Sequence, residues 1–295
     1  MNDQAATAAT GNTAHAVRSV GFIGLGDQGG PMARALADSR FELHVWARRP
    51  SSLDALEGSP YTAHPTRAAL IAAVDVLALC VTDDDDVRAI IESPDAAGAF
   101  RAGQIVVNHG TGDPARNRAL AAEMAKVGVG YLDAPVSGGN AGARERALTT
   151  MVGGDEETFR ACAPVFAVYS ATVAYMGPAG AGQLTKLLNN AMTMSNLANA
   201  IDMVTLASQL GLDVSQVMSV IGASSGASTS LRNLAVVSRD LAPHLRGLYG
   251  KDIEHFAGAM RADNLDPGPL HERGTYAADR LVDVVSLLPP AAAGS

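Results

Sequence analysis

Lys186 lies in a long apolar stretch together with two other polar side chains that could act with it. Asn190 follows four residues later and Thr193 seven residues later, so in a helix the three share one face. Groups arranged in this way can bind one small polar molecule, and a lysine amine in apolar surroundings can exchange a proton with it. The alternative is a lysine at a helix start whose amine stays in solvent, the usual place of lysine.

A glycine-rich loop near the start of the chain is a second candidate site. A β-prone run at 19–23 is followed by Gly24, Gly26 and Gly29 in the pattern G-x-G-x-x-G, and then by a helical run at 31–37. Between a strand and a helix, this spacing permits a tight turn, close approach of the backbone to a pyrophosphate, and close helix packing. The alternative is a glycine loop without function, but the flanking elements favour dinucleotide binding.

The residues after the next predicted strand, 42–46, indicate which dinucleotide is bound. Proteins that select NAD place an acidic residue here to bind the ribose 2′-hydroxyl, whereas this chain has Ala47, Arg48 and Arg49. Two guanidinium groups without a carboxylate favour a 2′-phosphate, and therefore NADP over NAD. The alternative is a pair of surface arginines, in which case NAD could serve as well.

A third polar cluster follows the strand predicted at 130–135. Ser137, Gly138 and Gly139 come after a proline-fixed turn, and their hydroxyl and backbone N–H groups could bind a carboxylate. Spacing alone favours neither this binding loop nor a simple Ser-Gly-Gly turn.

Four consecutive acidic residues and two cysteines look at first like metal ligands. The acidic run at 83–86 immediately precedes the apolar residues of a helix, so capping of the helix N-terminus is predicted ahead of a metal site. Cys80 and Cys162 have no spacing typical of metal or redox sites, which predicts buried free thiols in a reducing compartment.

A long helix predicted over 183–210 must position Lys186. It lies between a glycine-rich turn at 177–182 and Gly211, has no internal proline or glycine, and would be about 42 Å long. Its apolar residues fall on nearly every face, so we expect it to be buried all round and to join two domains or two subunits.

The segments on the two sides of this helix predict two domains of different class. Before it, alternating strands and helices indicate an α/β Rossmann-type domain with a largely parallel sheet over 18–178. After it, helical spacing alone indicates an all-α substrate and dimerisation domain, which with the long helix covers 179–289. Further strands are predicted at 75–81, 104–108, 148–152 and 171–176, and further helices at 214–221, 230–240, 251–262 and 271–288.

Composition limits the partners and the location. With 47% hydrophobic and 18% charged residues the chain is globular, and its net charge of −8 argues against nucleic acid and anionic membrane surfaces. The sequence has no run of eighteen apolar residues, so no membrane span is predicted. Residues 1–17 lack the pattern of a signal or transit peptide and, like 290–295, are predicted to be disordered; we expect a cytoplasmic protein.

Five motifs are spread along the chain between about residues 20 and 288. They are GFIGLG at 21–26, LDAPVSGG at 132–139, MVGGD at 151–155, GAGQLTKLLNN at 180–190 and Lys251-Asp252. Together they resemble the β-hydroxyacid dehydrogenase family, which contains 3-hydroxyisobutyrate dehydrogenase, tartronate semialdehyde reductase and, more distantly, 6-phosphogluconate dehydrogenase.

The resemblance implies a role for each candidate residue. Lys186 corresponds to the catalytic lysine, Asn190 to the side chain that orients the reacting hydroxyl, and the Ser-Gly-Gly loop at 137–139 to the binding site of the substrate carboxylate. Cofactor contacts are implied for Gly24, Leu25, Gly26, Asp27, Gln28, Gly29, Ala47, Arg48, Arg49, Val81, Thr82, Thr111 and Lys251. The expected partners are a small carboxylic acid and further copies of the chain, as a homodimer or a dimer of dimers.

The implied reaction is NADP-linked, reversible oxidation of a 3-hydroxy acid to its semialdehyde or ketone, with Lys186 as general acid and base. Burial beside a second cation, Lys251, would lower the pKa of the lysine enough for this role. One alternative is an imine reductase-like enzyme on the same fold, although that family has a residue other than lysine at this position. The other is a dinucleotide-binding protein without catalytic activity.

Several residues depart from the family pattern. Gly110 stands where the family usually has serine, so a hydroxyl on the substrate side is missing, and Arg146 stands at a usual glycine. Arg144 and Arg146 could bind a second acidic group of the substrate, or could lie in solvent. The other departures are Gln28 for methionine, Thr82 for proline and Asp202 for glutamate.

Overall fold

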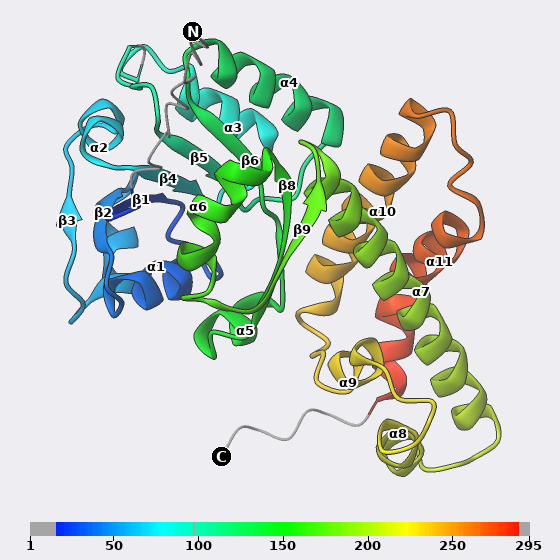
Figure 1. Ribbon diagram of the computed structural model, residues 1–295. Coiled ribbons are helices and arrows are strands. Elements are labelled where there is room, and N and C mark those ends of the chain that lie inside the picture. Colours follow the sequence, from blue (N-terminus) through cyan, green and yellow to red (C-terminus); the bar gives the residue numbers. More distant parts are fainter. Residues whose placement is uncertain (1–15, 97, 289–295) are drawn as a thin grey trace, which may run out of the picture.

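The computed structural model describes residues 16–96 and 98–288, and it consists of a sheet with helices on both faces and a separate group of helices (Figure 1). The predicted fold class, a Rossmann-type α/β domain followed by an all-α domain, is confirmed. Almost all of the termini predicted to be disordered, 1–17 and 290–295, lies outside the described residues.

All seven strands predicted from the sequence are present, with two short additional strands, β3 and β7, and helices alternate with most of them. The strands are β1 (Ser19–Ile23), β2 (Glu42–Trp46), β3 (Thr62–Ala63), β4 (Val76–Leu79), β5 (Ile105–Asn108), β6 (Gly130–Asp133), β7 (Val136–Ser137), β8 (Leu148–Gly154) and β9 (Ser170–Gly177). The helices are α1 (Gly29–Ala37), the 3₁₀ helix η1 (Pro50–Leu56), α2 (Arg67–Ala73), α3 (Asp84–Ile91), α4 (Pro114–Lys126), α5 (Gly139–Arg144), α6 (Glu156–Phe166), α7 (Ala181–Gln209), α8 (Val214–Gly222), α9 (Thr229–Leu234), α10 (Ala242–Ala262) and α11 (Gly268–Leu287).

The strands form one sheet in the order β3-β2-β1-β4-β5-β6-β8-β7, with β9 paired to β8. The strands from β3 to β6 in this order are all parallel, whereas β8 is antiparallel to β6 and β7. The strand order reverses between β1 and β4, and in such sheets the crevice beyond the carboxyl ends of these strands binds ligands. The topology therefore directs attention to the loops that follow β1 and β4.

Two apolar cores hold the helices on the sheet. Met32 of α1 and Phe166 of α6 belong to the core on one face, and Leu70 of α2, Ile90 of α3 and Leu120 of α4 belong to the core on the other. Both faces of the sheet are therefore covered, which explains why its strands read as continuous apolar runs in the sequence.

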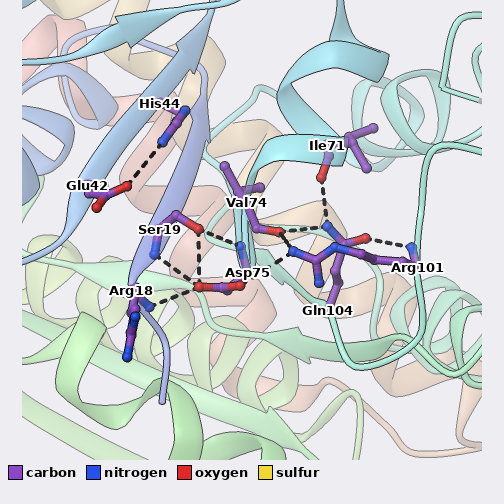
Figure 2. Close-up of polar contacts among 9 residues, drawn as sticks. All are labelled: Arg18, Ser19, Glu42, His44, Ile71, Val74, Asp75, Arg101 and Gln104. Atoms are coloured by element: carbon purple, nitrogen blue, oxygen red, sulfur yellow. Dashed lines mark hydrogen bonds and ion pairs between the residues drawn. The ribbon is translucent and has the colours of Figure 1, made fainter. Parts of the chain in front are cut away.

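A polar network fixes the end of the sheet at which β1, β4 and β5 begin, opposite to the end with the loops that follow β1 and β4 (Figure 2). Asp75, before β4, accepts hydrogen bonds from the backbone N–H of Ser19 at 3.1 Å and of Arg18 at 3.0 Å. Burial would raise the pKa of Asp75, but these bonds and that from Arg101 outweigh it and hold the pKa below its ordinary value. The buried Gln104 side chain donates to the carbonyl of Ile71 in α2 and to that of Val74, the C-cap of α2. The network stabilises the sheet at the amino ends of its strands, so the carboxyl ends remain available for binding.

Helix α7 leaves the sheet beside β9 and forms the axis of the helical domain, where α10 and α11 pack along it (Figure 1). It has 29 residues, in agreement with the predicted long helix. The prediction that it is buried all round was wrong for the single chain. Leu188, Met192, Leu206 and Leu210 are 48%, 55%, 57% and 73% exposed, because no other element of the described chain covers this side.

Two helix boundaries in the second domain differ from the prediction by more than one helical turn. Helix α10 begins at Ala242 rather than at 251, because Pro243 lies in its first turn, where no N–H is needed, and so begins the helix. Helix α9 ends at Leu234, whereas the helical pattern extended to 240.

The acidic run begins α3, as predicted. The Asp83 carboxylate accepts a hydrogen bond from the Asp86 N–H at 3.0 Å and so caps the helix, and Asp85 forms an ion pair of 2.6 Å with Arg116. Both cysteines are free thiols; Cys162 is buried and Cys80 is half-buried. Burial raises the pKa of both, so neither is a reactive thiolate.

Candidate active site

The loop after β1 has the shape that close approach of a ligand to the backbone requires. Gly24 has a φ of 102°, and a Cβ there would lie 2.0 Å from the Cys80 carbonyl oxygen. A Cβ on Gly29 would lie 1.9 Å from the Gly24 carbonyl oxygen. A Cβ on Gly26, by contrast, would meet no atom within 4 Å. Two glycines are therefore needed to fold the loop, and the third leaves open space beside it.

That space belongs to a cavity of about 510 Å³ at the strand-order reversal, formed by the loops after β1, β2 and β4. Arg48 and Arg49 lie at its rim and are exposed. The shape and the donors fit a dinucleotide, with backbone at the pyrophosphate position and guanidinium groups at the ribose. The predicted residues that line this cavity are Gly24, Leu25, Gly26, Asp27, Gln28, Gly29, Ala47, Arg48, Arg49, Val81 and Thr82.

A second cavity of about 330 Å³ shares a wall with the first and lies between the two domains. The shared wall consists of Gln28, Cys80, Val81 and Thr82. Lys186, Asn190, Thr111, Lys251 and Gly139 line the second cavity, so residues far apart in the sequence meet there. Ser137 and Gly138 precede Gly139 directly but are not among the lining residues.

Two buried side chains fix the first turn of α7, on which the position of Lys186 depends. Asp133 at the end of β6 accepts hydrogen bonds from the backbone N–H of Gly180 at 2.7 Å and of Gln183 at 2.8 Å. The Gln183 side chain accepts from the Gly112 N–H and donates to the Gly110 carbonyl, both in the loop after β5. Helix α7 is thus tied to two strands of the sheet one turn before Lys186.

The Asp133 anchor leads to a stability prediction. In an Asp133→Asn variant one amide –NH₂ must face a backbone N–H, so a buried donor loses its partner and we expect a loss of about 1–3 kcal/mol of unfolding free energy. Thermal or urea denaturation measures this loss. The matched control is Asp213→Asn, an exposed cap of α8, where asparagine caps equally well and little change is expected. Equal stabilities of the two variants would contradict the anchoring role.

Lys186 is half-buried in the wall of the second cavity. Burial lowers the pKa of Lys186, although the negative charge of Asp252 opposes this. Among the described residues no carboxylate oxygen lies within 4.0 Å of the amine, so its nitrogen is free to face a ligand. Asn190 donates from Nδ2 to Asp252 Oδ2 at 3.3 Å. The Thr193 hydroxyl instead donates to the Asn189 carbonyl in its own helix, so the predicted third member of this polar face does not reach the cavity.

Comparison with known proteins shows the family to which this chain belongs. Residues 19–177 match the family model described as the NAD binding domain of 6-phosphogluconate dehydrogenase. Residues 180–266 match the one described as NAD-binding of NADP-dependent 3-hydroxyisobutyrate dehydrogenase. The chain belongs to the β-hydroxyacid dehydrogenase family.

Individual relatives of this β-hydroxyacid dehydrogenase cover most of its length. The 2-hydroxy-3-oxopropionate reductase of Escherichia coli is 30% identical over 238 residues, 79% of this chain and 81% of its own. The structure of Mycobacterium tuberculosis 3-hydroxyisobutyrate dehydrogenase with L-serine has a TM-score of 0.77 and 26% identity, over 92% of this chain and 94% of that one. Psf3 in complex with NADP+ and 2-OPP has a TM-score of 0.76 and 28% identity, over 92% and 100%. The chain is accordingly an NAD(P)-dependent oxidoreductase that acts on CH–OH groups.

Three acidic or basic side chains in the cavity of the dehydrogenase were missed as site residues in the sequence. Asp252 and His255 follow Lys251 on α10 by one and four residues, and both line the second cavity. The i, i+4 spacing from Lys251 was the signal that could have identified His255. Asp252 was noted as part of a motif but without a role, and its bond to Asn190 supplies one.

His109 is the third missed residue, and it lies buried in the wall of the second cavity. Its Nδ1 donates to the Ala134 carbonyl at 2.8 Å, which leaves Nε2 to accept from the Tyr169 hydroxyl at 3.0 Å. Burial lowers the pKa of His109 to about 4, against the opposing effect of the carbonyl. A neutral imidazole bonded at both nitrogens holds the loop after β5 in place.

Two departures from the family pattern gain a physical account. A Cβ on Gly110 would lie 3.0 Å from the Val81 carbonyl oxygen, so the loop packs closer to β4 than a serine would allow without a shift. Arg146 has a φ of 56°, the left-handed conformation that suits the glycine usual in the dehydrogenase family. Its guanidinium pairs with Asp38 at 2.8 Å, and Arg144 donates to Asn140.

The surroundings of Arg144 and Arg146 also bear on substrate binding. Both line a separate cavity beside α1, and neither is among the residues that line the cavity of Lys186. They are therefore poorly placed to bind an acidic group of a molecule that also reaches Lys186.

Proposed function

We propose that this chain is an NADP-dependent dehydrogenase that interconverts a small 3-hydroxy acid and its semialdehyde or ketone. The observation that carries the proposal is the shared wall between the two cavities. Lys186 and Asn190 line the second cavity next to this wall, which supports a position beside the reactive end of a dinucleotide bound in the first. A volume of about 330 Å³ suits a substrate of a few carbon atoms.

In this proposal Lys186 moves the proton of the reacting hydroxyl. A nicotinamide held at the shared wall would supply a hydride acceptor for the carbinol carbon in oxidation and a hydride donor in reduction. The neutral Lys186 amine takes the hydroxyl proton in oxidation, and the ammonium gives it back in reduction. Asn190, oriented by Asp252, holds the substrate oxygen in line with that amine. The Ser-Gly-Gly loop at 137–139 binds the substrate carboxylate, which the position of Gly139 in the cavity wall supports.

Single-turnover oxidation of NADPH against a panel of small semialdehydes and β-keto acids tests the proposal. We expect a rapid loss of NADPH absorbance with at least one of these carbonyl compounds. Reaction with cyclic imines alone would support an imine reductase. Tight NADPH binding without any turnover would support a non-catalytic dinucleotide-binding protein. The lysine in the cavity favours the dehydrogenase over both.

The arginines at the rim of the first cavity predict tighter binding of NADPH than of NADH. Loss of a charge-assisted bond to the 2′-phosphate in Arg48→Ala should reduce the NADPH preference by about 10- to 100-fold. Fluorescence titration with both cofactors measures it. Arg160→Ala, which removes an exposed arginine on α6, is the control and should retain the wild-type preference. Equal dissociation constants in the wild type would refute NADP selectivity.

The uncovered side of α7 supports the proposal that the protein is a homodimer or a dimer of dimers. At about 100° per residue, Leu188, Met192, Leu206 and Leu210 lie within about 40° of one another. They form an apolar stripe along α7 that is interrupted by Ser195 and Asn199. A second copy of the chain can bury this stripe, so light scattering should give at least twice the chain mass of 30.2 kDa. Leu206→Glu should weaken the association. A wild-type monomer at micromolar concentration would count against the assembly.

A further inference from the structure

His255 is the polar cavity residue that the proposed reaction does not use. It lies on α10 one turn after Lys251, on the same side of the helix, and it lines the cavity of Lys186 and Asn190. Its side chain is half-buried, and within residues 16–96 and 98–288 its ring forms no hydrogen bond. An imidazole in the wall of a small cavity, without a hydrogen-bond partner among the described residues, is placed to bind part of a ligand.

The charges around His255 indicate which kind of group it would bind. Asp252 is the carboxylate in the cavity wall, and Lys186, His255 and Lys251 all lie within Coulombic range of it. With three basic side chains against one acid, the cavity wall can accept an anionic group without a net repulsive charge. One substrate carboxylate, at the Ser-Gly-Gly loop, together with proton transfer at Lys186, does not account for the imidazole. A second anionic group on the substrate would.

We propose that His255 is a specificity-determining residue that binds a second carboxylate of the substrate. The preferred substrates are then hydroxy dicarboxylates and the corresponding semialdehydes. This rests on the proposed dehydrogenase function and names its substrate class. Arg144 and Arg146, the alternative binders of a second acid, line a different cavity. A ring N–H of His255 donates to the carboxylate in either protonation state, and Lys251 adds positive charge one turn away.

A matched pair of hydroxy acids measures the effect of the second carboxylate on the reaction. 3-Hydroxyisobutyrate and 2-(hydroxymethyl)succinate differ by one carboxylate in place of a methyl hydrogen. With NADP+, wild-type enzyme should oxidise the dicarboxylate with a kcat/KM about tenfold or more higher, chiefly through a lower KM. His255→Leu, which keeps the bulk, should abolish this ratio, and His255→Gln, which keeps an N–H donor, should retain part of it.

The control is His244→Leu, which changes an exposed histidine of the same helix that is absent from the cavity wall and should preserve the wild-type ratio. A wild-type enzyme that oxidises both acids equally well, or only the monocarboxylate, would overturn the proposal while leaving the dehydrogenase function intact. So would a His255→Leu enzyme that keeps the ratio.

Calorimetric binding of the same two acids to the NADPH complex gives the ratio without turnover. Failure of the wild type to oxidise any hydroxy acid would instead count against the proposed function. In that case, tighter binding of the dicarboxylate that is lost in His255→Leu would still support the second-carboxylate site. Equal binding of the two acids would overturn it.

Discussion

Replacement of Lys186 by alanine is expected to slow the chemical step by about 10²–10⁴-fold, the effect of removing a positioned proton-transfer group. NADPH affinity should change little, because Lys186 lines the second cavity, whereas the glycine loop and the arginines line the first. Single-turnover kinetics measure the rate of hydride transfer, and fluorescence titration measures cofactor binding. The control is Lys126→Ala at the end of α4, which should retain wild-type kinetics.

The same residue predicts opposite pH profiles in the two directions. Burial lowers the pKa of Lys186 below its ordinary value, despite the opposing charge of Asp252. Oxidation needs the neutral amine, so its rate should rise with pH and level off above this lowered pKa. Reduction needs the ammonium, so its rate should fall as pH rises through the same value. Both inflections should be absent from the residual activity of Lys186→Ala.

Lys186→Arg distinguishes a proton-transfer role from a purely electrostatic one. A guanidinium stays protonated at any working pH and cannot act as a base, so this variant should be nearly as slow as Lys186→Ala. If the lysine merely paired with a carboxylate, arginine would substitute well and the loss would appear in KM. A Lys186→Arg enzyme with near-native kcat would therefore refute the catalytic assignment.

Local sequence signals predicted the parts of the site that are fixed by short-range geometry. The β1–loop–α1 unit followed from glycine spacing, because Gly24 and Gly29 are required by backbone contacts within a few residues or with the neighbouring strand. The shared face of Lys186 and Asn190 followed from helical periodicity. Acid capping of α3 followed from the position of the acids before an apolar run.

The remaining features depend on contacts between distant segments. The i, i+4 spacing puts His255 on the same side of α10 as Lys251, but only the packing of α10 against α7 shows that this side faces the cavity. The anchoring of α7 by Asp133 and Gln183 joins residues about 50 to 70 positions apart. Thr193 was misplaced because periodicity gives a face, whereas its hydroxyl bonds its own backbone. Periodicity also could not show that Leu188 and Leu206 lie on a side that the chain itself leaves uncovered.

The glycine loop allows cofactor binding and folding to be separated by two single-methyl changes. In Gly26→Ala the added methyl meets no atom within 4 Å and the backbone φ is not positive, so the stability of the free protein should stay near that of the wild type. The methyl instead occupies space that the pyrophosphate must approach, and NADPH affinity should fall by about tenfold or more, which is about 1.4 kcal/mol.

In Gly29→Ala the added methyl would lie 1.9 Å from the Gly24 carbonyl oxygen and 3.1 Å from Cys80 Cβ, so α1 must move away from the loop. Such overpacking costs about 1–3 kcal/mol, and we expect both thermal stability and NADPH affinity to fall. Thermal denaturation without cofactor and fluorescence titration with NADPH, applied to both variants, separate the two effects. Wild-type NADPH affinity in Gly26→Ala would show that the pyrophosphate does not bind at this loop. Equal loss of stability in both variants would show that Gly26, like Gly29, is required to fold it.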